Sequence, residues 1–151
     1  MPSHYEGSEK EVRALDTYIK LMRASDTITA RLTELKTLED LSLSQFGTME
    51  ALYHLGTMCQ KDIGEKILKS SGNITMVIDN LEKKGLVARE RDESDRRFLR
   101  VSLTEAGRKK IEEILPERVD AIVEMISTLT PEEQKNLGRL AKKLGKNIQD
   151  V

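Results

Sequence analysis

Several residue types and patterns are scarce or missing in this chain of 151 residues. It has one cysteine, no tryptophan and 3% aromatic residues. A lone Cys59 excludes an internal disulfide framework and is typical of a protein in a reducing cytoplasm. No run of 18 apolar residues occurs, and the first ten residues lack the apolar segment of a secretory signal. We therefore expect a cytoplasmic protein without a transmembrane helix, large enough to bury a core of its own.

The residues and motifs that enzymes and metal sites require are also missing. The two histidines, His4 and His54, are far apart and have no cysteine or acidic partner at metal-ligand spacing. No P-loop, glycine-rich nucleotide motif or catalytic triad signature is present. These absences predict a protein that is not an enzyme and that holds neither a cofactor nor a metal ion.

Charge is abundant but unevenly distributed along the chain. Charged residues make up 34% of the sequence, and the formal net charge is −1, which argues against a nucleic-acid partner. Residues 83–110, however, carry ten basic and five acidic side chains. Because fields fade over about 8 Å at physiological salt, this local excess matters more than the total. It fits either a solvated mixed surface or a segment that approaches phosphates.

Both ends of the chain have long helical patterns. Apolar residues recur every three or four positions across residues 8–36, which predicts a helix of roughly 40 Å. Thr130-Pro131-Glu132-Glu133 is a helix start, and a coiled-coil-like series of apolar residues follows it. Between them, Thr104 is expected to cap a helix that Pro116 kinks or breaks. Helices this long and apolar predict packing against a partner chain.

In the middle of the chain the spacing of apolar residues changes from a helical to a strand-like pattern. Ser44 is the expected N-cap of a helix that ends at Gly56. A short helix over residues 60–68 and a helix over residues 72–84 follow. Residues 86–91 and 98–103 then alternate apolar and polar side chains about a polar turn, which indicates a β-hairpin. This order predicts a winged helix-turn-helix, with a helical bundle carrying an incidental hairpin as the alternative.

Two features favour the winged helix-turn-helix. The helix over residues 72–84 has a polar outer face that includes side chains able to hydrogen-bond base edges. The hairpin tip, Asp95-Arg96-Arg97, lacks the Gly, Asn or Pro of a purely structural turn. Arginine at a protruding tip suits a narrow minor groove, and the Asp95 carboxylate can orient it.

Residues 41–115 resemble the MarR family of bacterial transcriptional regulators. The matching stretches are Leu43-Ser44-Gln45-Phe46 and residues 80–87, which read Asn-Leu-Glu-Lys-Lys-Gly-Leu-Val. The most specific are Asp92-Glu93-Ser94-Asp95-Arg96-Arg97 and residues 101–107, Val-Ser-Leu-Thr-Glu-Ala-Gly. The flanking helices are similar as well, so the resemblance covers most of the chain.

The resemblance implies a mainly α fold with a small β-hairpin, in which long dimerisation helices flank a winged helix-turn-helix. The implied domains are an N-terminal dimerisation helix at 1–40, a DNA-binding region at 41–104 and C-terminal dimerisation helices at 105–151. Members of this family are homodimers that bind double-stranded DNA at pseudo-palindromic operators. Many are repressors that a small phenolic or other aromatic ligand, or cysteine oxidation, releases from DNA.

The resemblance and the polar faces together give the candidate site residues. The expected DNA-binding residues are Ser70, Ser71, Asn73, Thr75, Met76, Asn80, Lys83, Asp95, Arg96 and Arg97. A ligand pocket is expected near Met22, Phe46, Met49 and Tyr53, although these side chains would equally suit a core. Two alternatives remain open: a regulator without a small-molecule effector, and a thiol-redox sensor that acts through Cys59. The family's oxidation-sensing members have their cysteine near the start of the first long helix, where this chain has none, so a buried structural thiol is the preferred interpretation.

Overall fold

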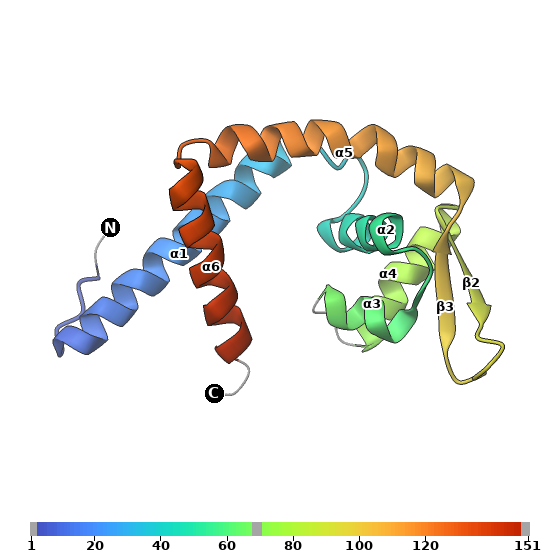
Figure 1. The fold of residues 1–151 in the computed structure, drawn as a ribbon, viewed down its shortest axis with the longest axis horizontal. Helices are drawn as coiled ribbons and strands as arrows, with labels where there is room; N and C mark the ends of the chain where they lie inside the picture. Colours follow the sequence, from blue (N-terminus) through green and yellow to red (C-terminus); the bar gives the residue numbers. More distant parts are fainter. Residues whose placement is uncertain (1–2, 68–70, 149–151) are drawn as a thin grey trace. The chain divides into compact units, whose positions relative to one another are not determined.

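A computed structural model describes residues 3–67 and 71–148 (Figure 1). It contains six helices and three short strands within those residues. The elements in chain order are α1 Glu9–Glu34, α2 Leu43–Leu55, β1 Met58–Cys59, α3 Gln60–Lys66, α4 Ser71–Lys83, β2 Val87–Arg91, β3 Leu99–Leu103, α5 Glu105–Ile126 and α6 Pro131–Asn147. The predicted fold class, mainly helical with a small β-hairpin in a winged helix-turn-helix, is confirmed.

The chain divides into two compact units. The central unit is Thr37–Arg118, and the terminal unit combines Met1–Lys36 with Val119–Val151. The central unit therefore holds α2, β1, α3, α4, the hairpin and the first part of α5. The domain bounds expected at residues 40/41 and 104/105 stay a prediction.

The sheet of the central unit is antiparallel, with strand order β1-β3-β2. β2 and β3 form the predicted hairpin, in register from Val87 opposite Leu103 to Arg91 opposite Leu99. The two-residue β1 adds an edge strand through Met58 opposite Val101. The sequence analysis did not anticipate β1, because two residues are too short to show alternation.

One hydrophobic core underlies the helices and the hairpin of the central unit. Its fully buried side chains come from α2, α3, α4, β3 and α5, so each element depends on the others for burial. Burial of an aliphatic side chain contributes about 1.5–3 kcal/mol, which outweighs local helix propensity. The largest fully buried apolar side chains are Met49, Ile63, Ile78, Leu81, Val101 and Ile111.

Two local expectations were wrong. The N-cap of α2 is Ser42 rather than Ser44, because Ser42 and Gln45 form a reciprocal capping box. Ser44 already lies inside the helix, where its carbonyl accepts a bond from Thr48. Pro116 does not break α5, which is one continuous helix through that position. The kink that was expected there as the other outcome stays a prediction. Ile111 and Ile114 on the preceding turns are buried in the core, and this burial offsets part of the cost of the proline.

The two longest helical predictions for the terminal unit are confirmed. Ser8 caps α1 and Thr130 caps α6, each in a capping box with a glutamate three residues later. Neither α1 nor α6 buries a residue in the protomer. Large apolar side chains are exposed instead on three helices, namely Tyr18, Leu21 and Met22 of α1, Val119, Ile122 and Val123 of α5, and Leu137, Leu140 and Leu144 of α6. No helix within residues 3–67 and 71–148 is long and apolar enough to cross a membrane.

Gly107, in the first turn of α5, lies close to the backbone of Leu86, the residue before β2. Thr104 caps α5 by accepting a bond from the Gly107 amide at 3.0 Å, and its own amide donates to the Leu86 carbonyl at 3.1 Å. A Cβ on Gly107 would overlap that same carbonyl oxygen and crowd Leu103. The start of α5 can therefore pack against β2 only when residue 107 lacks a side chain.

We expect Gly107→Ala to lower the free energy of unfolding by about 1–3 kcal/mol, because overpacking must displace backbone. Gly47→Ala is the matched control, since Gly47 also lies in a helix of the central unit and its Cβ would meet Ile67 at an ordinary 3.6 Å. The control should be neutral or gain up to about 1 kcal/mol from helix propensity. Urea unfolding of both variants at one protein concentration measures the difference, and equal stabilities would refute the close approach.

Candidate nucleic-acid interface

Helix α4 has one face in the core and one face in solvent. Ile74, Ile78 and Leu81 are buried at helical spacing, which fixes the rotation of the helix about its axis. The opposite side chains are therefore presented outward, and Met76 is 63% exposed. Five of the expected DNA-binding residues are exposed on this helix and make up what we call its reading face, namely Asn73, Thr75, Met76, Asn80 and Lys83.

Two predicted residues at the start of α4 have little structural description. Ser70 lies outside the described residues, and Ser71 is the first residue of α4 with an undescribed side chain. Their assignment to DNA binding stays a prediction.

The sequence analysis missed Gln60, which contacts α4 from the start of α3. Its amide nitrogen donates to the Thr75 hydroxyl at 3.0 Å, and its amide oxygen is buried without a hydrogen-bond partner among the described residues. Gln60 and Thr75 line a cavity of about 280 Å³ with Cys59 and Arg97 among the other lining residues. Residues 15 positions apart gave no local signal for this contact. Cys59 itself is half-buried and is not in a disulfide.

The β2–β3 hairpin, residues 87–103, is the wing of the winged helix-turn-helix. Asp92 holds the turn at its tip through hydrogen bonds. Its carboxylate accepts bonds from the amides of Ser94 at 2.8 Å and Asp95 at 3.1 Å, and from Arg100 at 3.3 Å. These bonds, with the Ser94 hydroxyl bond as the largest contribution, lower the pKa of Asp92 from 3.8 to about 2. The turn is therefore held by an ionised carboxylate rather than by glycine or proline.

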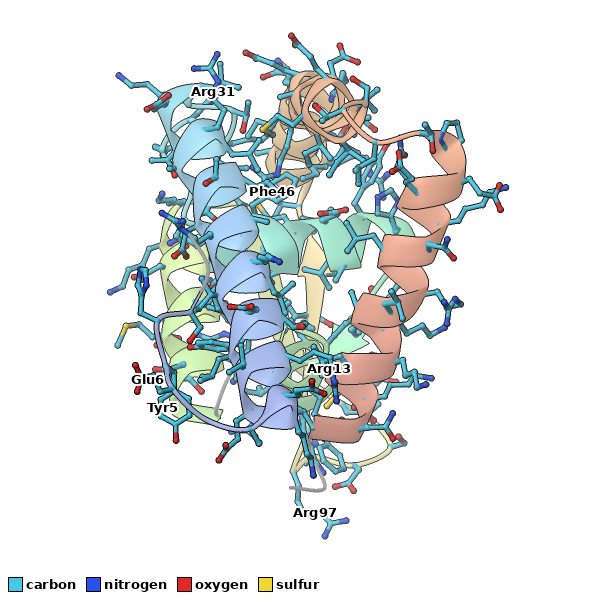
Figure 2. All side chains as sticks on the ribbon, turned by 90° about the vertical axis from the view of Figure 1, so that its left-hand side faces the viewer. Tyr5, Glu6, Arg13, Arg31, Phe46 and Arg97 are labelled. Carbon is cyan, nitrogen blue, oxygen red and sulfur yellow. The ribbon has the colours of Figure 1, made fainter. Side chains whose placement is uncertain are left out.

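The wing arginine is oriented by its neighbouring acid. The Arg97 guanidinium donates to both oxygens of Asp95, at 3.0 Å and 2.7 Å, and the Arg97 amide donates to the same carboxylate at 3.1 Å. This paired geometry lowers the pKa of Asp95 and raises that of Arg97. The Arg97 side chain is nevertheless 84% exposed and extends beyond the ribbon of the hairpin (Figure 2). Arg96 is exposed as well, and its carbonyl accepts a bond from Arg91 at 3.1 Å.

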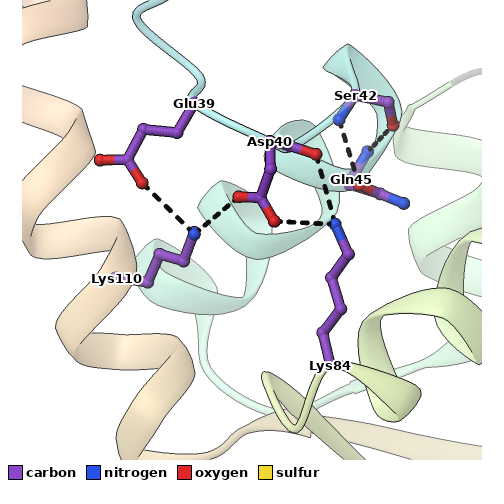
Figure 3. Close-up of polar contacts among 6 residues, drawn as sticks. All are labelled: Glu39, Asp40, Ser42, Gln45, Lys84 and Lys110. Atoms are coloured by element: carbon purple, nitrogen blue, oxygen red, sulfur yellow. Dashed lines mark hydrogen bonds and ion pairs between the residues drawn. The ribbon is translucent and has the colours of Figure 1, made fainter.

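An ion-pair network lies at the C-terminal end of α4 (Figure 3). Lys84, just after the helix, and Lys110 of α5 both donate to the Asp40 carboxylate, at 3.3 Å and 2.7 Å. Lys110 also lies 3.3 Å from Glu39. Hydrogen bonds from Lys110 and then Lys84 lower the pKa of Asp40 to about 2. Lys84 and Lys110, two basic residues of the segment 83–110, thus pair with acidic residues that precede α2, and not with residues on the exposed face of α4.

The expected ligand-pocket residues fall in different places. Phe46 and Met49 are buried in the core of the central unit, where the Arg118 guanidinium covers the Phe46 ring at 5.0 Å from its centroid. Tyr53 is half-buried and donates to Glu112 at 3.3 Å. Met22 is exposed on α1, in the terminal unit. A shared pocket stays a prediction.

No group of three or more His, Cys, Asp or Glu side chains within residues 3–67 and 71–148 has the arrangement of a metal site. The exposed chemistry of the central unit is therefore that of hydrogen-bonding and cationic side chains on α4 and the wing. Such a surface can contact base edges and phosphates.

A family model and a curated relative both match this chain. The model of the MarR family matches residues 41–98. The HTH-type transcriptional regulator MhqR of Bacillus subtilis is 36% identical over 137 residues, covering 91% of this chain and 94% of that protein. Both the match and its location confirm the resemblance seen in the sequence.

Two solved structures are similar over nearly their whole length. AbsC, a MarR family transcriptional regulator from Streptomyces coelicolor, has a TM-score of 0.82 and 23% identity, covering 97% of this chain and 99% of that one. BpsR of Bordetella bronchiseptica, whose DNA binding is regulated by 6-hydroxynicotinic acid, has a TM-score of 0.76 and 27% identity, covering 85% of this chain and 98% of that one.

Proposed function

The chain belongs to the MarR family of DNA-binding transcriptional regulators rather than to any enzyme class, and we propose that it is a repressor that binds a pseudo-palindromic operator as a homodimer. In this proposal α4 enters the major groove of each half-site and Arg97 enters the adjacent minor groove. Such a protein acts on chromosomal DNA in the cytoplasm.

The observation that carries the proposal is the pairing of one outward helix face with one outward arginine. Asn73 and Asn80 can hydrogen-bond base edges, and exposed Met76 can contact a thymine methyl group. Arg97 is already oriented by Asp95 before any DNA is present, so less side-chain entropy is lost on binding. The carboxylates of the remaining chain keep non-specific attraction to DNA modest.

Arg97→Ala should weaken operator binding by about 1–3 kcal/mol, the usual range for one good groove contact. The operator is first selected from a random duplex library with the unmodified protein, and fluorescence anisotropy at fixed salt then measures Kd. Arg108→Ala is the control, because Arg108 lies in the same basic segment but stacks on Tyr53, 5.5 Å from its ring centroid. Equal affinities of the Arg97 variant and the unmodified protein would exclude the wing from DNA contact.

The homodimer is proposed to form through the terminal unit. Its three helices expose large apolar side chains that no part of the protomer buries, and Val123 is 61% exposed. Large apolar side chains exposed in this number indicate an interaction site. Leu137, Leu140 and Leu144 on α6 and Ile148 at its C-cap recur at the spacing of a helix–helix seam, which suits a second copy of the same chain.

A double change of Leu140 and Leu144 to Asp should convert the dimer to a monomer, because two charges would be buried in the interface. Both positions are about half exposed in the protomer, so its own fold should survive. Lys142→Asp, on the opposite side of α6, is the control and should stay dimeric. Light scattering after size-exclusion chromatography gives the mass, and a dimer that persists in the double variant would exclude this face.

A small aromatic or phenolic effector is proposed to release the protein from DNA. The support is the similarity to BpsR, for which 6-hydroxynicotinic acid regulates DNA binding. Met22, Phe46, Met49 and Tyr53 remain the proposed lining of the effector pocket. Cys59 provides the alternative, because its half-buried thiol lines the same cavity as Arg97.

A panel of phenols and aromatic carboxylic acids, 6-hydroxynicotinic acid included, should contain a compound that raises the thermal midpoint and releases selected DNA. A ligand at 100 times its Kd stabilises the native state by about 2.7 kcal/mol, which is readily measured. No shift with any compound would favour a regulator without an effector. Release of DNA by the oxidant diamide, abolished in Cys59→Ser, would favour the redox alternative.

A further inference from the structure

Arg89 of β2 joins the hairpin to α4 through two carboxylates. Its Nη2 lies 2.6 Å from Asp79 and 3.0 Å from Glu82, and its Nε donates to Glu82 at 3.3 Å. Asp79 and Glu82 are three residues apart on α4, so both lie on the side of the helix that faces the hairpin. Arg89 therefore connects α4 directly to the hairpin.

The geometry of this contact is restrictive. A guanidinium is planar, and two carboxylates that bind its fork fix its direction as well as its position. The Arg89 side chain is only 20% exposed, and the hydrogen bonds that it donates to Glu82 and then to Asp79 raise its pKa. The same bonds lower the pKa of Glu82. Both shifts favour the charged forms of Arg89 and Glu82.

The position of Arg89 along β2 determines which part of the hairpin this contact restrains. Arg89 is opposite Val101, which is fully buried. Beyond that pair, toward the Arg97 tip, the strands carry exposed Glu90, Arg91 and Arg100 and half-buried Leu99. Arg89 therefore contacts α4 at the last level of the hairpin that has a fully buried side chain.

Stability alone gives little reason for this arrangement, because ion pairs at the protein surface contribute little to the free energy of unfolding. Its effect is on geometry, since a hairpin that pivots about its base would move Arg97 relative to α4. Simultaneous contact of both elements with one half-site needs that relative position to be fixed before DNA arrives.

We propose that Arg89 is a positioning residue for operator recognition, whose ion pairs with Asp79 and Glu82 hold the wing at a fixed angle to α4. The inference rests on the proposed function, because it concerns how the two reading elements are held for one half-site. It adds a residue that contacts no DNA but decides whether the Arg97 contact can form.

The first test measures wing geometry without DNA. Spin labels are placed at Met76→Cys on α4 and Glu93→Cys on the wing in a Cys59→Ser background, diluted with unlabelled protein. Electron–electron distance measurements should give a narrow distribution that broadens at least twofold in Arg89→Gln. Lys110→Gln is the matched control, because Lys110 also bridges two carboxylates, those of Glu39 and Asp40, and both precede α2 in the chain rather than lying on α4 or the hairpin. Glu82→Gln is a second variant and should broaden the distribution in the same way. Unchanged distributions in both variants would overturn the inference.

The second test uses a double-mutant cycle on the selected operator. Arg89→Gln should weaken binding about tenfold, the equivalent of about 1.4 kcal/mol. In that background, Arg97→Ala should cost less than a further twofold, because the wing is no longer positioned. An Arg97→Ala penalty that stays at tenfold or more would overturn the inference alone. Failure of the unmodified protein to select any DNA would instead overturn the proposed function, and this inference with it.

Discussion

Helix α4 and the β2–β3 hairpin pack on the same hydrophobic core. The exposed face of α4 and the Arg97 tip depend on that shared packing for their relative position. Ile78 and Leu81 on α4, Val87 on β2 and Val101 on β3 are all buried together. Because the core fixes one face of each element, the opposite faces are presented to solvent in a defined relation. Gly107 extends this constraint to α5, whose start can approach the hairpin only without a side chain.

Electrostatics then decides which parts of that surface can approach DNA. The net charge of −1 hides a segment with ten basic and five acidic residues. The structure divides those cations by role: Lys84, Arg89 and Lys110 pair with carboxylates that hold the fold, whereas Arg97 is directed outward by Asp95. Local pairing, rather than total charge, therefore determines where a polyanion can bind.

The sequence predicted the elements with strong local signals and missed contacts made in three dimensions. The hairpin, α1 and α6 follow from periodicity and capping residues, which act within a few positions. Ser44 was wrong as the cap of α2, because the reciprocal hydrogen bonds between Ser42 and Gln45 select Ser42 instead. The contact between Gln60 and Thr75 has no sequence signature, because packing of α3 on α4 creates it. Likewise, the residues expected to line a ligand pocket were indistinguishable from core residues, since both are apolar.

In the proposed function, α4 and the hairpin tip contact one operator half-site together. A crystal structure of the dimer on its selected duplex would show both contacts at once. We expect Asn73 and Met76 at base edges in the major groove, with Arg97 inside the adjacent minor groove of the same half-site. A complex in which the wing points away from the DNA, or in which another face of the central unit binds the duplex, would contradict this expectation.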